Sequence, residues 1–123
     1  MLQITPHQKL LLAIHPIDFR KGMDRLIAVC EQQLGIAPDD GSFFIFRNKK
    51  FTAVKIIIYD GQGYWLCMKR FSHGKLQWWP KNQDDVFNIS AQQLQVLLYQ
   101  GNPEAANIQP DWKPLTKFKQ LAQ

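Results

Sequence analysis

The chain has 123 residues, which is enough for one domain with a single hydrophobic core and too few for two ordinary domains. Its content of 46% hydrophobic and 20% charged residues is typical of a globular protein and argues against a disordered chain. The formal net charge of +5 favours an acidic partner, such as nucleic acid, over a neutral one.

Targeting and membrane-spanning segments are not expected. The first apolar run, LLLAI, is interrupted by His15 and Pro16, which does not fit a signal peptide. No apolar run approaches the ~18 residues of a membrane span. Cys30 and Cys67 lie in apolar patterns of different predicted elements, so we expect two reduced, buried thiols in a cytoplasmic protein, with a disulfide as the alternative.

The first predicted elements are a short buried strand at 9–14 and an amphipathic helix at 19–34. Asp18 is placed to cap the start of this helix, and Gly35 to end it in the left-handed conformation. The apolar stripe that predicts the helix consists of Phe19, Met23, Leu26, Ile27, Cys30 and Leu34.

A turn at 38–41 is followed by three or four strands. We expect them at 42–47, 52–59, 63–71 and 75–79. Asp60-Gly61 and Ser72-His73-Gly74 supply hairpin turns, which makes successive strands antiparallel. A second helix is predicted at 91–100, because Ser90 and Gln93 form a capping box and Gly101 stops the helix.

The predicted fold class is therefore α+β. An antiparallel sheet of about four to five strands carries both helices on one face, which leaves the other face for water or a partner. We expect one domain at 1–101. Residues 102–123 contain several prolines and form a loosely held tail, with Trp112 as a residue that pins it back.

Positive charge is concentrated in the predicted sheet. Between residues 47 and 81, eight basic side chains accompany one acid, Asp60. The basic residues are Arg47, Lys49, Lys50, Lys55, Lys69, Arg70, Lys75 and Lys81. Lys55 is expected on an exposed side of its strand, and aromatic residues beside these cations suit a nucleic acid through stacking and phosphate contacts. The alternatives are lysines that only protect a sheet from aggregation, and aromatics that belong to the core.

A second cationic group lies at the start of the first predicted helix. Arg20 and Lys21 would oppose the helix dipole there, and Gly22 costs up to ~1 kcal/mol relative to alanine. Unfavourable residues placed so close together are typical of a functional position. Arg20, Lys21 and Gly22, with the free N–H groups of a helix start, suit a phosphate oxygen. Alternatively, Arg20 pairs with Asp24 and Lys21 is only solvated.

No catalytic site, metal site or cofactor is expected. The histidines are far apart, and no nucleotide-binding, Ser–His–Asp or helix-turn-helix pattern is present. A two-metal nuclease needs converging carboxylates, but Asp18 is explained as a cap and Asp60 as a turn residue. If DNA is bound, the sheet or a helix end must bind it.

Four blocks, in order, resemble a known bacterial family. They are HPIDFRKGMDRLIAVCEQQLG, FFIFRNKK, VKIIIYDGQGYWLCMKRFSHGKLQWWP and ISAQQLQVLLYQG, and they cover about 10–101. The family is the TnpB-type accessory protein, the second open reading frame product, of insertion sequences of family sixty-six. The matching motif residues are Asp18, Arg20, Lys21, Gly22, Phe44, Phe46, Lys49, Lys50, Lys55, Ile56, Ile57, Asp60, Lys69, Arg70, Trp79 and Pro80. Phe19 replaces a methionine, Phe71 a leucine, and Ser72-His73 a more acidic pair.

The resemblance implies a non-enzymatic accessory factor for transposition, encoded beside a separate transposase. We expect it to bind DNA or the transposase–DNA complex through phosphates, with low sequence preference. The expected contacts are Arg20, Lys21, Gly22, Arg47, Lys49, Lys50, Lys55, Lys69, Arg70 and Lys75. The alternative is a protein-binding module that bridges or activates the transposase without touching DNA. The oligomeric state is left open.

Overall fold

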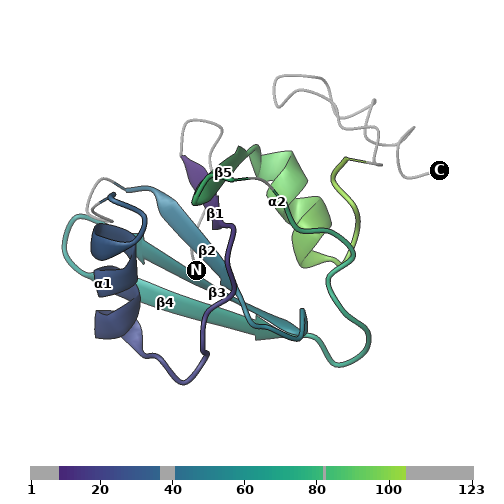
Figure 1. Ribbon diagram of the computed structural model, residues 1–123, viewed down its shortest axis with the longest axis horizontal. Coiled ribbons are helices and arrows are strands. Elements are labelled where there is room, and N and C mark those ends of the chain that lie inside the picture. Colours follow the sequence, from purple (N-terminus) through teal and green to yellow (C-terminus); the bar gives the residue numbers. More distant parts are fainter. Residues whose placement is uncertain (1–8, 37–40, 82, 105–123) are drawn as a thin grey trace.

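The computed structural model describes residues 9–36, 41–81 and 83–104. Within these ranges the chain forms five strands and two helices (Figure 1). They are β1 (Leu10–Ala13), α1 (Met23–Gln32), β2 (Phe43–Arg47), β3 (Ala53–Tyr59), β4 (Tyr64–Arg70), β5 (Val86–Ile89) and α2 (Ala91–Leu98). The turn predicted at 38–41 lies largely outside these ranges, as do Trp112 and most of the predicted tail. The domain boundary at residue 101 therefore stays a prediction.

The strands form one sheet in the order β4-β3-β2-β1-β5. The strand pairs β2–β3, β3–β4 and β1–β5 are antiparallel, and β1–β2 is parallel. The parallel pair follows from the long connection through α1, because a tight hairpin can join only antiparallel neighbours. The predicted α+β class and the mostly antiparallel sheet are confirmed.

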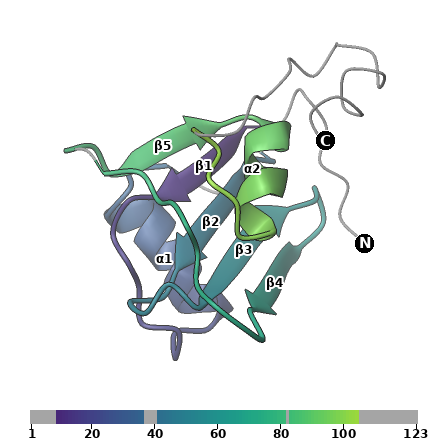
Figure 2. The ribbon, with the colours of Figure 1, turned by 90° about the vertical axis from the view of Figure 1, so that its right-hand side faces the viewer.

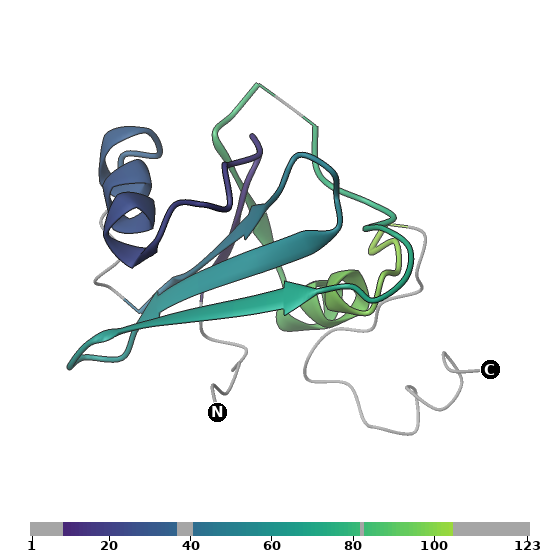
Figure 3. The same ribbon diagram turned by 90° about the horizontal axis from the view of Figure 1, so that it is seen from below.

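The two helices lie on opposite faces of the sheet, so the prediction that both pack on one face is wrong. Figure 2 shows α2 in front of the strands and α1 behind them, and Figure 3 shows the same layers from below. In β1, Leu10 and Leu12 join a core with α2, whereas Leu11 and Ala13 join a core with α1. Strands buried on both faces read as continuous apolar runs, and β1 and the first four residues of β2 have this pattern.

The helix boundaries differ from the prediction at the start of α1. The helix begins at Met23, four residues later than expected, and Gly22 is its extended N-cap without a capping side chain. Asp18 is therefore not the cap. At α2 the predicted capping box of Ser90 and Gln93 is confirmed, and the helix ends at Leu98. Gly35 has the expected positive φ, at 69°.

The strand predicted at 75–79 is also wrong. Residues 71–81 and 83–85 instead lie in the connection from β4, at one edge of the sheet, to β5 at the other edge, and the structure assigns them to no strand. Trp79 is 5% exposed, and its indole Nε1 donates a 2.9 Å hydrogen bond to the Ala13 carbonyl. The short strand β5 was not predicted.

Cys30 and Cys67 are free thiols, as predicted, but Cys67 is only partly buried, so its predicted burial is wrong. Cys30 is buried in α1, and this burial raises the pKa of its thiol to about 12. Among the described residues, no helix is long and apolar enough to cross a membrane.

Candidate nucleic-acid interface

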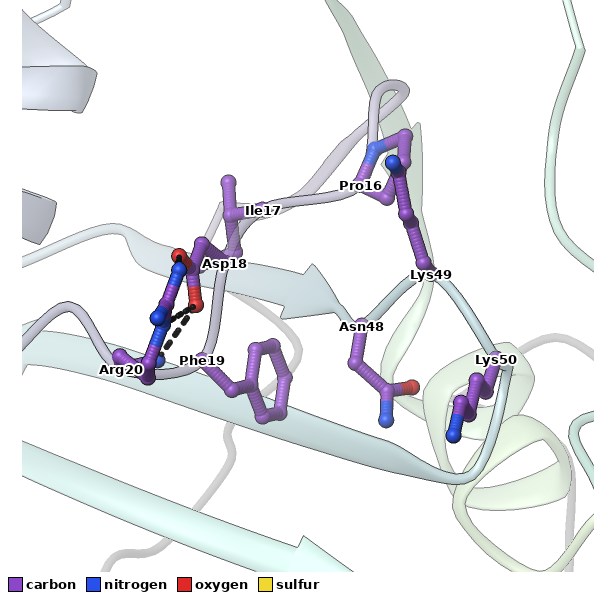
Figure 4. A pocket seen from close by; sticks show the side chains of 8 residues that line it. All are labelled: Pro16, Ile17, Asp18, Phe19, Arg20, Asn48, Lys49 and Lys50. Atoms are coloured by element: carbon purple, nitrogen blue, oxygen red, sulfur yellow. Dashed lines mark hydrogen bonds and ion pairs between the residues drawn. The ribbon is translucent and has the colours of Figure 1, made fainter.

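Two of the predicted cationic groups line one pocket of about 420 Å³. Residues 16–20, which precede α1, form one wall, and residues 48–50, in the turn between β2 and β3, form the other (Figure 4). Arg20 comes from the first wall and Lys49 and Lys50 from the second. The fold thus brings together two groups that lie about thirty residues apart in the sequence.

The turn that carries Lys49 and Lys50 is held by Asn48. Its Oδ1 accepts hydrogen bonds from the backbone N–H groups of Thr52 (2.9 Å) and Ala53 (3.1 Å), and its Nδ2 donates to Thr52 Oγ1 at 2.7 Å. Both lysine side chains are exposed. Within the described residues, neither makes a hydrogen bond or ion pair, so both ammonium groups are available to an anion.

Asp18 binds Arg20 instead of capping the helix. The Arg20 Nη2 lies 2.7 Å from Asp18 Oδ2, and the backbone N–H of Arg20 donates to Oδ1 at 2.9 Å. These bonds lower the pKa of Asp18 to about 2. The Arg20 side chain is 91% exposed, so its remaining N–H groups face solvent. The alternative pairing of Arg20 with Asp24 is not observed.

Lys55 is buried, so its prediction as an exposed residue of the sheet is wrong. It is 8% exposed, and its Nζ donates to the carbonyl oxygens of Phe19 (2.7 Å) and Lys21 (3.0 Å). The same ammonium lies 5.0 Å from the centre of the Phe19 ring. Lys55 points to the α1 side of β3, where it fixes the Arg20 segment to the sheet. It is a positioning residue and not a surface cation.

The helix-start site is also changed by the late start of α1. Arg20 and Lys21 precede the helix, so neither opposes its dipole from the first turn. Lys21 is partly buried, and its backbone N–H donates to the Asp18 carbonyl at 3.0 Å. Gly22 is exposed, and a Cβ added there would meet no neighbouring atom within 4 Å. The surface around Gly22 is therefore open.

Arg47 and Lys69 have partners inside the fold. The Arg47 guanidinium lies 3.9 Å from the centre of the Phe51 ring, and its burial lowers its pKa. Lys69 Nζ donates to the Leu98 carbonyl at 2.6 Å and lies 4.4 Å from the Tyr99 ring. Lys69 thus satisfies a carbonyl at the end of α2, where a cation is favourable.

Comparison with known proteins identifies the family. The family described as IS66 Orf2 like protein matches residues 8–107. The chain belongs to this family. It is also 31% identical to two uncharacterized proteins of Sinorhizobium fredii (strain NBRC 101917 / NGR234). The alignment with y4hO covers 93% of this chain and 96% of the relative, and that with y4jC covers 73% and 76%. No solved structure matches.

Membership of the IS66 Orf2-like family confirms the resemblance and implies an accessory role associated with transposition. The first two of the four blocks that carried the resemblance line the pocket. The segment with Arg20 and the turn with Lys49 and Lys50 line it, and Lys55 of the third block anchors the first. Motif residues from three of the four blocks therefore line this pocket or hold one of its walls.

The remaining predicted cations of this IS66 Orf2-like protein lie away from that pocket. Arg70 is exposed at the end of β4, an edge strand. Lys75 is exposed in the connection to β5 and lines a second pocket of about 350 Å³. Three other residues that shape the two pockets were not predicted: Phe19, Asn48 and Trp78. The sequence NKKF carries a signal for Asn48, because asparagine often anchors a turn through its own side chain.

Among the described residues, the carboxylates do not form a candidate metal site. Asp60 accepts hydrogen bonds from the backbone N–H groups of Gly63 and Gln62 and from the indole of Trp65, and these bonds lower its pKa. Its predicted role in the turn is confirmed. The described part of the chain contains no group of three or more His, Cys, Asp or Glu residues that could hold a metal ion.

Proposed function

We propose that this protein is a non-catalytic accessory factor for DNA transposition that binds DNA, or the transposase–DNA complex, chiefly through phosphates. The observation that carries this proposal is the pocket that Arg20, Lys49 and Lys50 line from two segments. Asp18 is the one acid among the residues that line it, and this carboxylate is already paired with Arg20.

The chemistry of the pocket suits a phosphate backbone. Two lysines without partners among the described residues supply point charges, and the free edge of a guanidinium supplies directed N–H donors. Contacts of this type position a protein on DNA without reading its bases, so we expect low sequence preference and a strong dependence on salt. Lys55 would act here indirectly, by keeping the Arg20 segment against the sheet.

The test is binding of the purified protein to labelled insertion-sequence ends and to unrelated duplex DNA, across a salt series. Both DNAs should bind with similar affinity and a steep salt slope. The double variant Lys49→Ala/Lys50→Ala should weaken binding to both and reduce the slope by about two, one for each lost phosphate contact. Lys9→Ala/Arg25→Ala removes the same charge from exposed positions outside the pocket and is the control.

An unchanged slope in the lysine variant, or an equal change in the control, would contradict the assignment of the pocket. Absence of binding at low salt would favour the second candidate, a module that bridges or activates the transposase without DNA contact. The observation in favour of that candidate is the exposure of three large apolar side chains, Trp65 (48% exposed), Met68 (54%) and Tyr99 (76%).

Two details argue against a protein-binding patch made by these three residues. Trp65 and Met68 are three positions apart in β4, so their side chains point to opposite faces of the sheet. Tyr99 has the Lys69 ammonium 4.4 Å from its ring centre, so it does not belong to an apolar patch free of cations. We therefore place DNA binding first.

A further inference from the structure

A second pocket lies next to the pocket of Arg20, Lys49 and Lys50, at the turn between β2 and β3. It has a volume of about 350 Å³ and is lined by Phe51, Trp78 and Trp79 together with Lys75 and Lys81. Phe51 directly follows Lys50, which lines the first pocket, so one turn contributes to both. Among the described residues that line the second pocket, none is acidic. It thus combines aromatic rings and cations.

The aromatic residues of this pocket are fixed by packing. The indole of Trp79 is held by its bond to the Ala13 carbonyl, and Trp78 is partly exposed and packs edge-on against Phe87, with ring centres 5.8 Å apart. The backbone N–H of Leu76 donates to the Phe51 carbonyl at 2.8 Å, which ties the connection to the turn. A ligand would therefore bind to rings that are already in place, which lowers the entropy cost of binding.

The charged side chains around the second pocket indicate the path that a bound DNA strand would take. Lys75 and Lys81 are exposed, and within the described residues neither ammonium makes a hydrogen bond or ion pair. A neighbouring pocket of about 310 Å³ shares Trp78 and Lys81 but also contains Glu104, which would repel a phosphate. The favourable path therefore leads from Lys75 and Lys81 towards Lys50 and the first pocket.

We propose that the second pocket binds an unpaired nucleobase of a DNA strand, stacked on Trp78, while the adjoining phosphates contact Lys75, Lys81 and Lys50. This inference rests on the DNA binding proposed above and adds strandedness to it. A paired base cannot enter such a pocket without leaving its stack, so the site favours single-stranded or locally opened DNA. It needs no particular base, because every base has a face that can stack.

The first experiment uses the unaltered protein and three labelled probes of equal length: a thymidine strand, the same strand with abasic residues throughout, and a duplex. The two single strands carry the same phosphates. The thymidine strand should bind about 5- to 150-fold more tightly than the abasic strand, the range for loss of one stacked base. Equal affinities for the two strands would overturn the inference.

The second experiment compares Trp78→Leu, Trp78→Phe and, as control, Trp65→Leu, which removes another half-exposed tryptophan. Thermal unfolding of each variant checks that the fold is kept. Trp78→Leu should abolish the difference between thymidine and abasic strands and leave duplex binding unchanged, whereas Trp78→Phe should keep most of the difference. A folded Trp78→Leu variant that keeps the full difference would overturn the role of Trp78.

The two proposals fail differently. If all three probes bind with a steep salt slope and equal affinity, phosphate binding stands and base stacking is wrong. If none of the probes binds at low salt, both proposals are wrong.

Discussion

The turns at the two ends of β3 are built alike and carry opposite charge. At one end Asn48 accepts the N–H groups of Thr52 and Ala53, and at the other Asp60 accepts those of Gln62 and Gly63. The first turn presents Lys49 and Lys50, whereas the second presents the carboxylate itself. A neutral anchor leaves the first turn positive, and a charged anchor makes the second negative. The two lysines beside a neutral anchor make the first turn the end of β3 that attracts a polyanion, and the Asp60 carboxylate makes the other end unfavourable.

The largest effect is expected from Lys55→Met, because Lys55 holds residues 16–20, the wall of the pocket that faces Lys49 and Lys50. The variant keeps the length of the side chain but loses two bonds from a buried ammonium to the Phe19 and Lys21 carbonyls. We expect a loss of about 2–3 kcal/mol in the free energy of unfolding, measured by urea denaturation. Duplex binding should also weaken, although Lys55 does not reach the surface.

Lys69→Met is the control for that change, because the exposed Lys69 ammonium donates to a single carbonyl. It should cost less than about 1 kcal/mol. Equal losses of unfolding free energy in the two variants would show that the buried Lys55 ammonium stabilises the fold no more than the exposed Lys69 ammonium does.

A smaller effect is expected from Asn48→Ala, which removes the anchor of the lysine turn and leaves two backbone N–H groups without their partner. We expect a loss of about 2 kcal/mol in unfolding free energy. Asn48→Asp keeps the acceptor oxygen, so it should cost less, but its carboxylate should weaken duplex binding by making this turn resemble the other one. If both variants lost the same stability, the turn would not depend on the side-chain oxygen.

The smallest effect is expected at the acidic turn and depends on pH. Because hydrogen bonds lower the pKa of Asp60 in the fold, the unfolded chain binds the proton more readily. The carboxylate therefore stabilises the fold fully above its unfolded pKa of about 3.9, and this stabilisation is lost as the pH falls through the lower folded pKa. The unfolding temperature of Asp60→Asn should be lower than that of the unaltered protein at neutral pH, and the two temperatures should converge in acid.

Asp24→Asn removes the same charge from an exposed position of α1 and is the control for the loss of one carboxylate. A gap between Asp60→Asn and the unaltered protein that stayed constant down to about pH 2 would contradict the carboxylate's role. Neither substitution should alter the salt slope of DNA binding, because both lie outside the pocket that contains Lys49 and Lys50.

Local signals predicted the parts of the fold that are local. The capping box at Ser90, the hairpin at Asp60 and the three strands from β2 to β4 depend on neighbours in the sequence, and all were predicted. The side of the sheet on which each helix lies is a tertiary property. The runs LLLA and FFIF already contain the relevant signal, since strands buried on both faces lose the alternation of a one-sided sheet.

The candidate site shows the same limit. Composition identified the cations, but it did not show which of them already bind carbonyl groups or aromatic rings of the protein itself. Alternation along β3 placed Lys55 away from Ile56, which is correct, but the opposite face is covered by the segment before α1 and is not exposed. The pairing of Asp18 with Arg20 spans two residues, and it forms here because α1 starts only at Met23. No rule about helix spacing predicts it.

The position of β1 has a consequence for the order of folding during synthesis. This strand pairs with β2 on one side and with β5 on the other, and Leu10 lies opposite Ile89. A ribosome releases the chain from its N-terminus at about 5–20 residues per second. The antiparallel run from β2 to β4 can therefore assemble while one edge of the apolar strand LLLA still waits for its partner. Until residue 89 emerges, that edge carries unpaired backbone N–H and C=O groups that can pair with strands of other chains.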